Sequence, residues 1–363
     1  MCQAPKQAVE RVKWDNVHER PEQKTLHAWL MRTGSLFVLY FLWVCGLGFY
    51  SSTWLLSFFY LIKAVVFGSA ESIPLFIRVY LIFMALYESY HYVMFRHKEQ
   101  SLWPSLRQWY RKTTATYPYF RHNITIFEDH EEESLKDPLQ PLVKADEKAM
   151  YGFHPHGVLS CGWSLNGAHS MRFAESGARW LVAENLFWFP LMRDILHWLE
   201  FGTVAKKTFL KFMREGRNIC LIPGGFEEAT LFEYGKHRVY IKKRLGFIKL
   251  ALQHGYKVRP VYTFGEELTF RTFSYFLKQR LLLNQYKIPG VAFTGRLLCF
   301  FLPFPDVDLV TVVGKAIELP TIEHPTREDV AKYHKLYVDA LVDIFERNKA
   351  KYAQNPDAVL EVY

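Results

Sequence analysis

The sequence lacks paired cysteines, a serine-hydrolase motif and any charge in one long apolar run, and each of these absences excludes a class of protein. The five cysteines contain no Cys-x-x-Cys pair and are odd in number, which is typical of reduced thiols in a cytosol-facing protein. There is no Gly-x-Ser-x-Gly stretch, which argues against a serine hydrolase. Residues 33–62 contain no Asp, Glu, Lys, Arg or His, and such an apolar run is too long for the core of a cleaved signal peptide.

The uncharged run predicts a membrane anchor. A helix of about 20 apolar residues can cross a hydrocarbon layer about 30 Å thick. A second, weaker apolar stretch at residues 73–95 carries three ionisable side chains, and it either crosses the bilayer or lies in its interface. Basic residues flank both stretches, so we expect a membrane-embedded helical hairpin at residues 33–95, preceded by a cytosolic segment at residues 1–32. The alternative is a pair of buried helices in a soluble core.

The overall composition excludes a multi-span membrane protein. Half of the residues are hydrophobic and 22% are charged, and the mean hydropathy is only −0.07. The net charge of +9 favours anionic partners such as phosphate groups, acidic lipid or nucleic acid, without choosing among them.

From about residue 113, short apolar runs alternate with amphipathic stretches. The candidate strands are residues 149–153, 179–183, 218–222, 257–264 and 309–313. Residues 205–216 and 246–255 are helical in pattern, and each ends at a glycine. A long amphipathic helix begins after the candidate N-cap Thr326, with Asp329 three residues on. This alternation predicts an α/β fold with a mostly parallel sheet and flanking helices.

Two histidines around a proline follow the first candidate strand, in the sequence YGFHPHGVLS. Pro155 fixes its own φ and pushes the residue before it toward extended geometry, and Gly157 permits a tight bend. The corner should therefore direct a ring into the space above the sheet, where ligands bind in open α/β folds. Because histidine titrates at about pH 6.5, we expect His156 to act as a general base toward a hydroxyl.

Two other interpretations of these histidines stay open. His154 and His156 would be half of a metal site only with a third ligand, and His169 and Glu175 stand at no recognised spacing. Alternatively, one or both rings are polar groups of the core.

A second candidate group follows the third strand, in the sequence CLIPGGFEEA. Gly224 and Gly225 would let main-chain N–H groups approach a substrate closely. Glu228 would orient a histidine or bind a polar head group. The alternative is an ordinary glycine turn.

Six Lys or Arg residues lie between positions 236 and 249, and a candidate helix begins near Gly246. Basic side chains and a helix N-terminus together favour phosphate, although a solvated basic face or contact with anionic lipid is equally compatible. This block contains neither of the usual nucleotide-binding glycine motifs.

In this order, the motifs resemble those of the type-2 diacylglycerol acyltransferase family, which also holds monoacylglycerol and wax-alcohol acyltransferases. The resemblance covers about residues 105–363 and is carried by YGFHPHG, PGGFEEA, RLGFIKLALQHG, RPVYTFGE, TVVGKAIELP, the long helix and the final LEVY. It implies a catalytic domain at residues 105–363 with a fold like the soluble glycerolipid acyltransferases. It also implies an enzyme of the endoplasmic reticulum membrane and the lipid droplet, with this domain in the cytosol.

The resemblance also assigns site residues. The family's motifs fall on His154, Pro155, His156, Gly157, Gly224, Gly225, Glu228, Arg244, Gly246 and Phe247. One departure is Ala205-Lys206-Lys207, where family members often carry Asn-Arg-Asp or Ser-Arg. A second is Leu159 and Cys161, where the wider glycerolipid acyltransferases have an Asp five residues after the catalytic histidine. The acidic partner must then come from elsewhere, and Glu228 is the candidate.

The reaction implied is acyl transfer from acyl-CoA to diacylglycerol. We expect His156 to deprotonate the hydroxyl, Glu228 to hold the His156 ring, and His154 to orient that ring or protonate the leaving thiolate. Main-chain N–H groups near Gly224 and Gly225 would stabilise the oxyanion. The expected partners are acyl-CoA as co-substrate, the lipid acceptor and membrane lipid, with no metal, no cofactor and no nucleic acid, while homo-oligomer formation stays open. A monoacylglycerol or wax-alcohol acyltransferase and a non-catalytic lipid-droplet protein are the alternatives.

Overall fold

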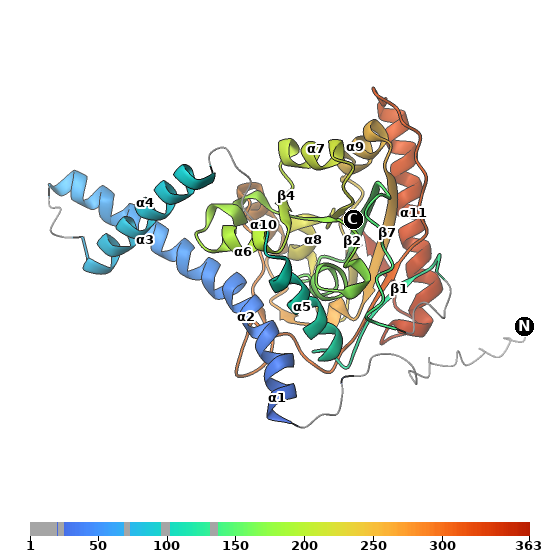
Figure 1. The fold of residues 1–363 in the computed structure, drawn as a ribbon, viewed down its shortest axis with the longest axis horizontal. Helices are drawn as coiled ribbons and strands as arrows, with labels where there is room; N and C mark the ends of the chain where they lie inside the picture. Colours follow the sequence, from blue (N-terminus) through green and yellow to red (C-terminus); the bar gives the residue numbers. More distant parts are fainter. Residues whose placement is uncertain (1–19, 21–24, 69–72, 96–101, 131–136) are drawn as a thin grey trace, which may run out of the picture.

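The computed structural model describes the chain in five pieces. They are residues 20, 25–68, 73–95, 102–130 and 137–363 (Figure 1). Most of the predicted cytosolic segment, residues 1–32, lies outside the described residues.

Seven strands form one sheet in the order β1-β10-β7-β2-β5-β3-β4 (Figure 1). They are β1 (His122–Phe127), β2 (Ala149–His154), β3 (Arg179–Val182), β4 (Phe201–Thr203), β5 (Ile219–Leu221), β7 (Lys257–Phe264) and β10 (Asp308–Val313). Neighbouring strands are parallel except for β10 and β7. The predicted α/β fold with a mostly parallel sheet is confirmed, and the five candidate strands agree with β2, β3, β5, β7 and β10 to within one residue at either end.

Four short strands lie outside the main sheet. β6 (His237–Val239) pairs in parallel with β11 (Leu360–Val362), and β8 (Arg271–Thr272) pairs antiparallel with β9 (Phe293–Thr294). None of these was predicted, because each has only two or three residues and is defined by its pairing with a segment that is distant in the sequence.

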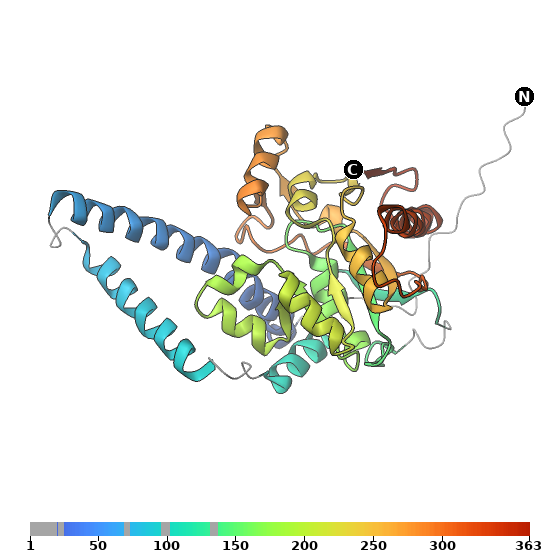
Figure 2. The same cartoon turned by 90° about the horizontal axis from the view of Figure 1, so that it is seen from above.

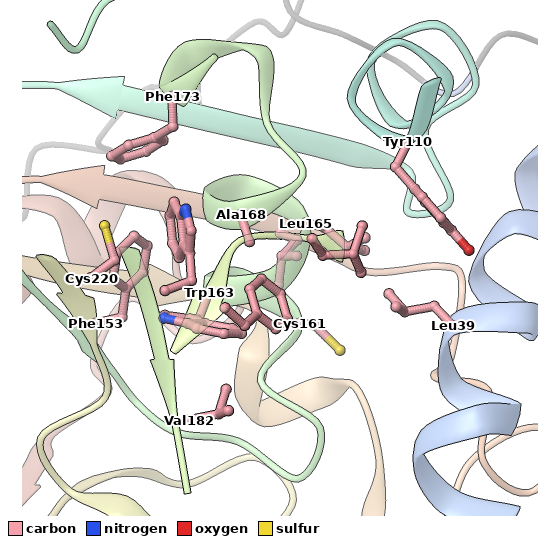
Figure 3. Packing of buried hydrophobic residues seen from close by; sticks show 14 of the residues in the cluster. Leu39, Tyr110, Phe153, Cys161, Trp163, Leu165, Ala168, Phe173, Val182 and Cys220 are labelled. Atoms are coloured by element: carbon pink, nitrogen blue, oxygen red, sulfur yellow. The ribbon is translucent and has the colours of Figure 1, made fainter. Parts of the chain in front are cut away.

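The sheet separates two apolar clusters, and the side chains of β2 alternate between them. Tyr151 and Phe153 join the cluster under α2 (Ser35–Phe41), α5 (Pro104–Thr116), α6 (Met192–Trp198) and the turn η5 (Gly162–Ala168) (Figure 3). Met150 joins the other cluster, under α7 (Lys206–Arg214), α9 (Gly246–His254) and α11 (Arg327–Tyr352). His154 is on the same side of the strand as Met150 and therefore faces α11.

The predicted helices are present. Thr326 caps α11 with a reciprocal capping box, in which its hydroxyl accepts from the Asp329 N–H at 3.1 Å and Asp329 accepts from the Thr326 N–H at 3.0 Å. Gly255 ends α9 in the left-handed conformation, with φ at 63°. The remaining helices and turns are α8 (Gly225–Leu231), α10 (Leu277–Leu283), η6 (Met171–Phe173), η7 (Glu184–Trp188), η8 (Glu266–Leu268) and η9 (Asn284–Tyr286).

One helix within the described part of the chain, Leu26–Phe67, is long and apolar enough to cross a bilayer. It consists of α1 (Leu26–Trp29), η1 (Leu30–Gly34), α2, η2 (Leu42–Gly46) and α3 (Leu47–Phe67). Its first half packs on the domain that contains the sheet, whereas α3 projects away beside α4 (Leu75–Phe95) (Figure 2). The 21 residues of α3 span about 31 Å, which matches the thickness of a hydrocarbon layer.

Polar side chains near the end of α4 are paired with α6 rather than left free. The Glu88 carboxylate lies 3.0 Å from the Arg193 guanidinium, and His91 Nε2 lies 3.1 Å from the Asp194 carboxylate. Tyr87 also donates to Asp194 at 2.6 Å. These contacts attach the end of α4 to the domain that contains the sheet, so Glu88 and His91, two of the three ionisable residues that are costly in a membrane helix, have partners there.

Candidate active site

Three neighbouring parallel strands, β7, β2 and β5, end at the same edge of the sheet, and the candidate residues stand just beyond these ends. His154 is the last residue of β2, and Glu228 lies in α8, which follows β5. The predicted histidines and Glu228 are therefore brought together at the edge where open α/β sheets bind ligands. The His154–Pro155 peptide bond is cis.

Glu228 is the central group of the site. Its carboxylate is 1% exposed and lies 3.2 and 3.3 Å from Nδ1 of His154. It also accepts the main-chain N–H groups of His156 at 2.6 Å and Tyr240 at 2.7 Å. We expected this carboxylate to hold the His156 ring. Instead it contacts the His154 ring and fixes His156 through its backbone.

His154 is fully buried and has a partner at each ring nitrogen. Its Nε2 lies 3.2 Å from the Tyr337 hydroxyl, which also donates to the Gly152 carbonyl at 3.2 Å. A Cβ at Gly152 would lie 2.1 Å from that hydroxyl, so glycine is needed there. The His154 ring is 0% exposed and is enclosed between the Glu228 carboxylate and the Tyr337 hydroxyl.

His156 is partly exposed and has one ring nitrogen engaged. Nδ1 lies 3.1 Å from the Gly157 carbonyl and 3.3 Å from the Ser160 hydroxyl. The carbonyl can only accept, so it favours the tautomer with hydrogen on Nδ1, which leaves the Nε2 lone pair for a proton. Burial lowers the pKa of His156 below its ordinary 6.5, although the Gly157 carbonyl and Glu228 oppose this shift. The ring is therefore neutral, and able to accept a proton, at neutral pH.

The two glycines before Glu228 serve its placement. Gly225 adopts a positive φ of 59°, and its N–H donates to the Ile222 carbonyl at 3.2 Å. The Gly225 N–H thus has a partner within the turn, and the expected oxyanion contact of the main-chain N–H groups near Gly224 and Gly225 stays a prediction. Gly224 lies directly against the Glu228 carboxylate, since an added Cβ would be 2.0 Å from its Oε2.

Gly224→Ala should therefore disturb the site, and Gly246→Ala supplies a matched control. The new methyl group at position 224 must displace Glu228, and overpacking of this kind costs about 1–3 kcal/mol. At position 246 a Cβ meets nothing within 4 Å, and alanine favours a helix over glycine by about 1 kcal/mol. Thermal unfolding should show a lower midpoint for Gly224→Ala and an equal or higher one for Gly246→Ala. Equal midpoints for the two variants would contradict this account of Gly224.

The Arg-x-Gly-Phe block supports the same corner. Arg244 donates to the Gly224 carbonyl at 3.1 Å and pairs with Glu227, and its guanidinium lies 5.2 Å from the centre of the Tyr240 ring. Gly246 is the first residue of α9, and Phe247 packs its ring edge-on against Tyr337 at 5.0 Å. Four exposed lysines share this segment: Lys236, Lys242, Lys243 and Lys249.

His154, His156, His169 and Glu175 were the candidate ligands of a metal site, and the structure does not gather them into one group of ligands. His169 is buried against the Tyr110 ring at 5.3 Å, and burial together with Arg111 and Arg107 lowers its pKa to about 3. Among the residues that the structure describes, His, Cys, Asp and Glu form no group of three that could hold a metal ion.

Sequence reasoning missed three residues of the site. Tyr337 lies 183 positions from His154 in an amphipathic helix, and nothing local distinguishes it. Ser160 contacts the His156 ring from four residues away. Glu266 is a charged residue two positions after the buried strand β7 and at the same sheet edge, which was a usable signal.

Fold and site define a membrane-associated α/β enzyme. The family model described as diacylglycerol acyltransferase matches residues 73–363, and the chain belongs to this family. Relatives include Diacylglycerol O-acyltransferase 2-like protein 6 of Mus musculus, 33% identical over 58% of this chain and 68% of the relative. Diacylglycerol O-acyltransferase 2 of Dictyostelium discoideum is 31% identical over 59% of this chain and 69% of its own length. The human 2-acylglycerol O-acyltransferase 3 is 34% identical over 56% of this chain and 65% of its own length.

One solved structure is similar to the chain over most of its length. The crystal structure of the 1-acyl-sn-glycerophosphate acyltransferase PlsC from Thermotoga maritima covers 90% of this chain and 100% of its own, with 13% identity and a TM-score of 0.40.

Proposed function

We propose that this chain is an acyl-CoA-dependent O-acyltransferase that esterifies diacylglycerol to triacylglycerol, with His156 as its general base. One observation carries the choice of base. His156 is partly exposed and its Nε2 is available, whereas His154 is fully buried between Glu228 and Tyr337. Family membership supports the reaction class. Monoacylglycerol is the second candidate acceptor, because one relative is named as an acyltransferase of 2-acylglycerol.

In this mechanism Nε2 of His156 removes the proton from the acceptor hydroxyl. The hydroxyl oxygen forms a bond to the thioester carbonyl carbon of acyl-CoA, and the carbonyl becomes an oxyanion. The carbon–sulfur bond then breaks, and the imidazolium returns its proton to the departing CoA thiolate. Ester and free CoA are the products, and no cofactor is consumed. A positioned base of this kind contributes about 10²–10⁴-fold to the rate.

The hydrogen bonds around His156 support direct transfer of the acyl group from acyl-CoA to the acceptor, without an intermediate on Ser160. The Ser160 hydroxyl is 5% exposed and faces Nδ1, so it orients the ring and does not stand where a substrate carbonyl would arrive. The exposed Lys242 and Lys243 follow Tyr240, whose N–H contacts Glu228, so they offer positive charge to the CoA phosphates close to the site.

The outer surface supports contact with a bilayer, which we place at the cytosolic face of the endoplasmic reticulum and at lipid droplets. Residues 273–300 lie on the side of the catalytic domain from which α3 and α4 project (Figures 1 and 2). Leu297 and Leu298 in this segment are 99% and 98% exposed. The segment adjoins the N-terminal helix, since Phe301 packs against Phe37 at 5.3 Å. Apolar side chains exposed to this extent beside an anchor are expected to sit in lipid.

Photo-crosslinking tests whether residues 273–300 face the bilayer. In vesicles that contain diazirine-labelled phosphatidylcholine, peptides covering residues 273–300 should carry lipid adducts. Leu336 is 45% exposed and belongs to α11, a helix on the other side of the domain from α3 and α4 (Figure 1), so its peptide should carry none. Equal labelling of both peptides would overturn the proposed orientation.

An acceptor panel tests the reaction. Membranes from cells that express the chain are supplied with labelled oleoyl-CoA and with diacylglycerol, monoacylglycerol or hexadecanol. Labelled triacylglycerol from diacylglycerol is the expected product. Diacylglycerol or wax ester as the main product would keep the mechanism and change the acceptor. No product above membranes that lack the chain would favour the non-catalytic lipid-droplet protein.

A further inference from the structure

We infer that Glu266 is a positioning residue of this reaction, because its carboxylate clamps the two ends of the loop at residues 155–162 and so fixes the direction of the His156 ring. The inference rests on the proposed function, since it concerns the placement of the proposed base.

The carboxylate of Glu266 contacts the loop at both ends. Oε1 accepts the Cys161 N–H at 3.0 Å, and Oε2 accepts the Gly162 N–H at 2.6 Å. At the other end, Gly157 packs directly on the same group, because a Cβ there would lie 2.0 Å from Oε1. One fully buried carboxylate therefore fixes the loop immediately after His156 and again where η5 begins.

Both groups that orient the His156 ring lie inside this clamp. They are the Gly157 carbonyl and the Ser160 hydroxyl. Ser160 adopts a positive φ of 53°, a conformation that non-glycine residues rarely keep without support from their surroundings. If the clamp is weakened, the loop can relax and the ring partners move with it.

The position of Glu266 is itself firmly set. Gly265 turns the chain at the end of β7 with φ at 86°, and a Cβ at that position would lie 2.2 Å from the Asp308 carbonyl oxygen. The Thr269 hydroxyl donates to the Glu266 carbonyl at 2.7 Å. The clamp is thus anchored in the sheet, on the strand that pairs with β2.

Glu267 provides a matched control. It is the next residue, is 2% exposed, and lies 3.6 Å from Nε2 of His237, away from the loop. Burial raises the pKa of both Glu266 and Glu267, so both groups are similarly desolvated, and the N–H groups of Cys161 and Gly162 oppose this rise at Glu266 because they favour its ionised form. Of these two neighbouring residues, only Glu266 forms hydrogen bonds with the loop of His156 in the part of the chain that the structure describes.

The test compares Glu266→Gln, Glu266→Asp and Glu267→Gln in the full chain. A glutamine presents an NH₂ group to one of the two loop N–H donors, so one donor loses its acceptor. We expect kcat of Glu266→Gln to fall about 10²-fold, as for a misplaced catalytic group, with KM for acyl-CoA nearly unchanged. Glu266→Asp, which keeps two acceptor oxygens, should recover part of this loss. Glu267→Gln should keep kcat even if its unfolding temperature falls.

A second measurement does not depend on turnover. The rate at which diethylpyrocarbonate modifies His156, followed by peptide mass spectrometry, should rise several-fold in Glu266→Gln and stay unchanged in Glu267→Gln. An unchanged modification rate in Glu266→Gln would overturn the inference, and so would equal losses of kcat in the two glutamine variants. Absence of transfer by the native chain would instead overturn the proposed function, and the modification rates would still decide on the clamp.

Discussion

Replacement of His156 by alanine is expected to lower kcat for triacylglycerol formation by about 10²–10⁴-fold, the usual contribution of a general base. The fold should survive, because the side chain is partly exposed and Glu228 holds His156 through its main-chain N–H. Initial rates with labelled oleoyl-CoA in membranes of equal protein content give the measurement. His324→Ala is the control, since this ring is 90% exposed and lies 4.0 Å from the neighbouring Glu323 carboxylate, away from the candidate site.

The same base predicts a pH dependence. Burial lowers the pKa of His156 below 6.5, so the neutral, proton-accepting ring dominates above that pH. The ratio kcat/KM should be constant at neutral pH and decline only as pH falls through the lowered pKa. The residual rate of His156→Ala should lack this decline. A decline that begins at or above pH 7 would assign the base to another group.

Glu228→Gln is expected to remove both activity and stability. The carboxylate serves the His154 ring and the N–H groups of His156 and Tyr240, and it has no access to water that could replace them. An amide in its place turns an NH₂ group toward at least one of these donors. Each buried donor left without an acceptor costs about 1–3 kcal/mol.

Thermal unfolding and the acyl-transfer assay should therefore both show large losses for Glu228→Gln. Glu227→Gln is the comparison, because its pair with Arg244 is about one third exposed and such pairs contribute about 0–1 kcal/mol. A Glu228→Gln variant that unfolds no earlier than Glu227→Gln would show that the three contacts do not stabilise the fold.

The fold was largely predictable from the sequence because its central strands are buried on both faces. Strands β2, β5 and β7 are buried along almost their whole length, and the apolar residues that dominate them bound them to within a residue. The reversed direction of β10 relative to β7 was not predictable. It depends on the path of residues 265–307, where exposed apolar residues and short pairings replace any regular pattern.

The sequence predicted which residues come together at the candidate site, but not which hydrogen bonds they form with one another. Strand ends and glycines identified His154, His156 and Glu228, since these signals are local. Which histidine ring contacts the Glu228 carboxylate depends on how the rings on the two sides of Pro155 are rotated, and no sequence pattern encodes that rotation. Among the acidic residues, the sequence singled out Glu228 alone as a partner of the His156 ring. In the structure two buried carboxylates share the task, Glu228 at the main chain before the ring and Glu266 at the loop after it.

The contact between the N-terminal helix and the catalytic loop has a consequence for how the molecule can be divided. Tyr40 on α2 donates to Cys161 Sγ at 3.3 Å, and Leu36 and Leu39 are buried beside it, as the position of Leu39 in Figure 3 indicates. Cys161 is one of the two residues that Glu266 holds. The N-terminal helix and the domain that contains the sheet therefore share one apolar core, and a chain cut at residue 105 would lose one side of that core.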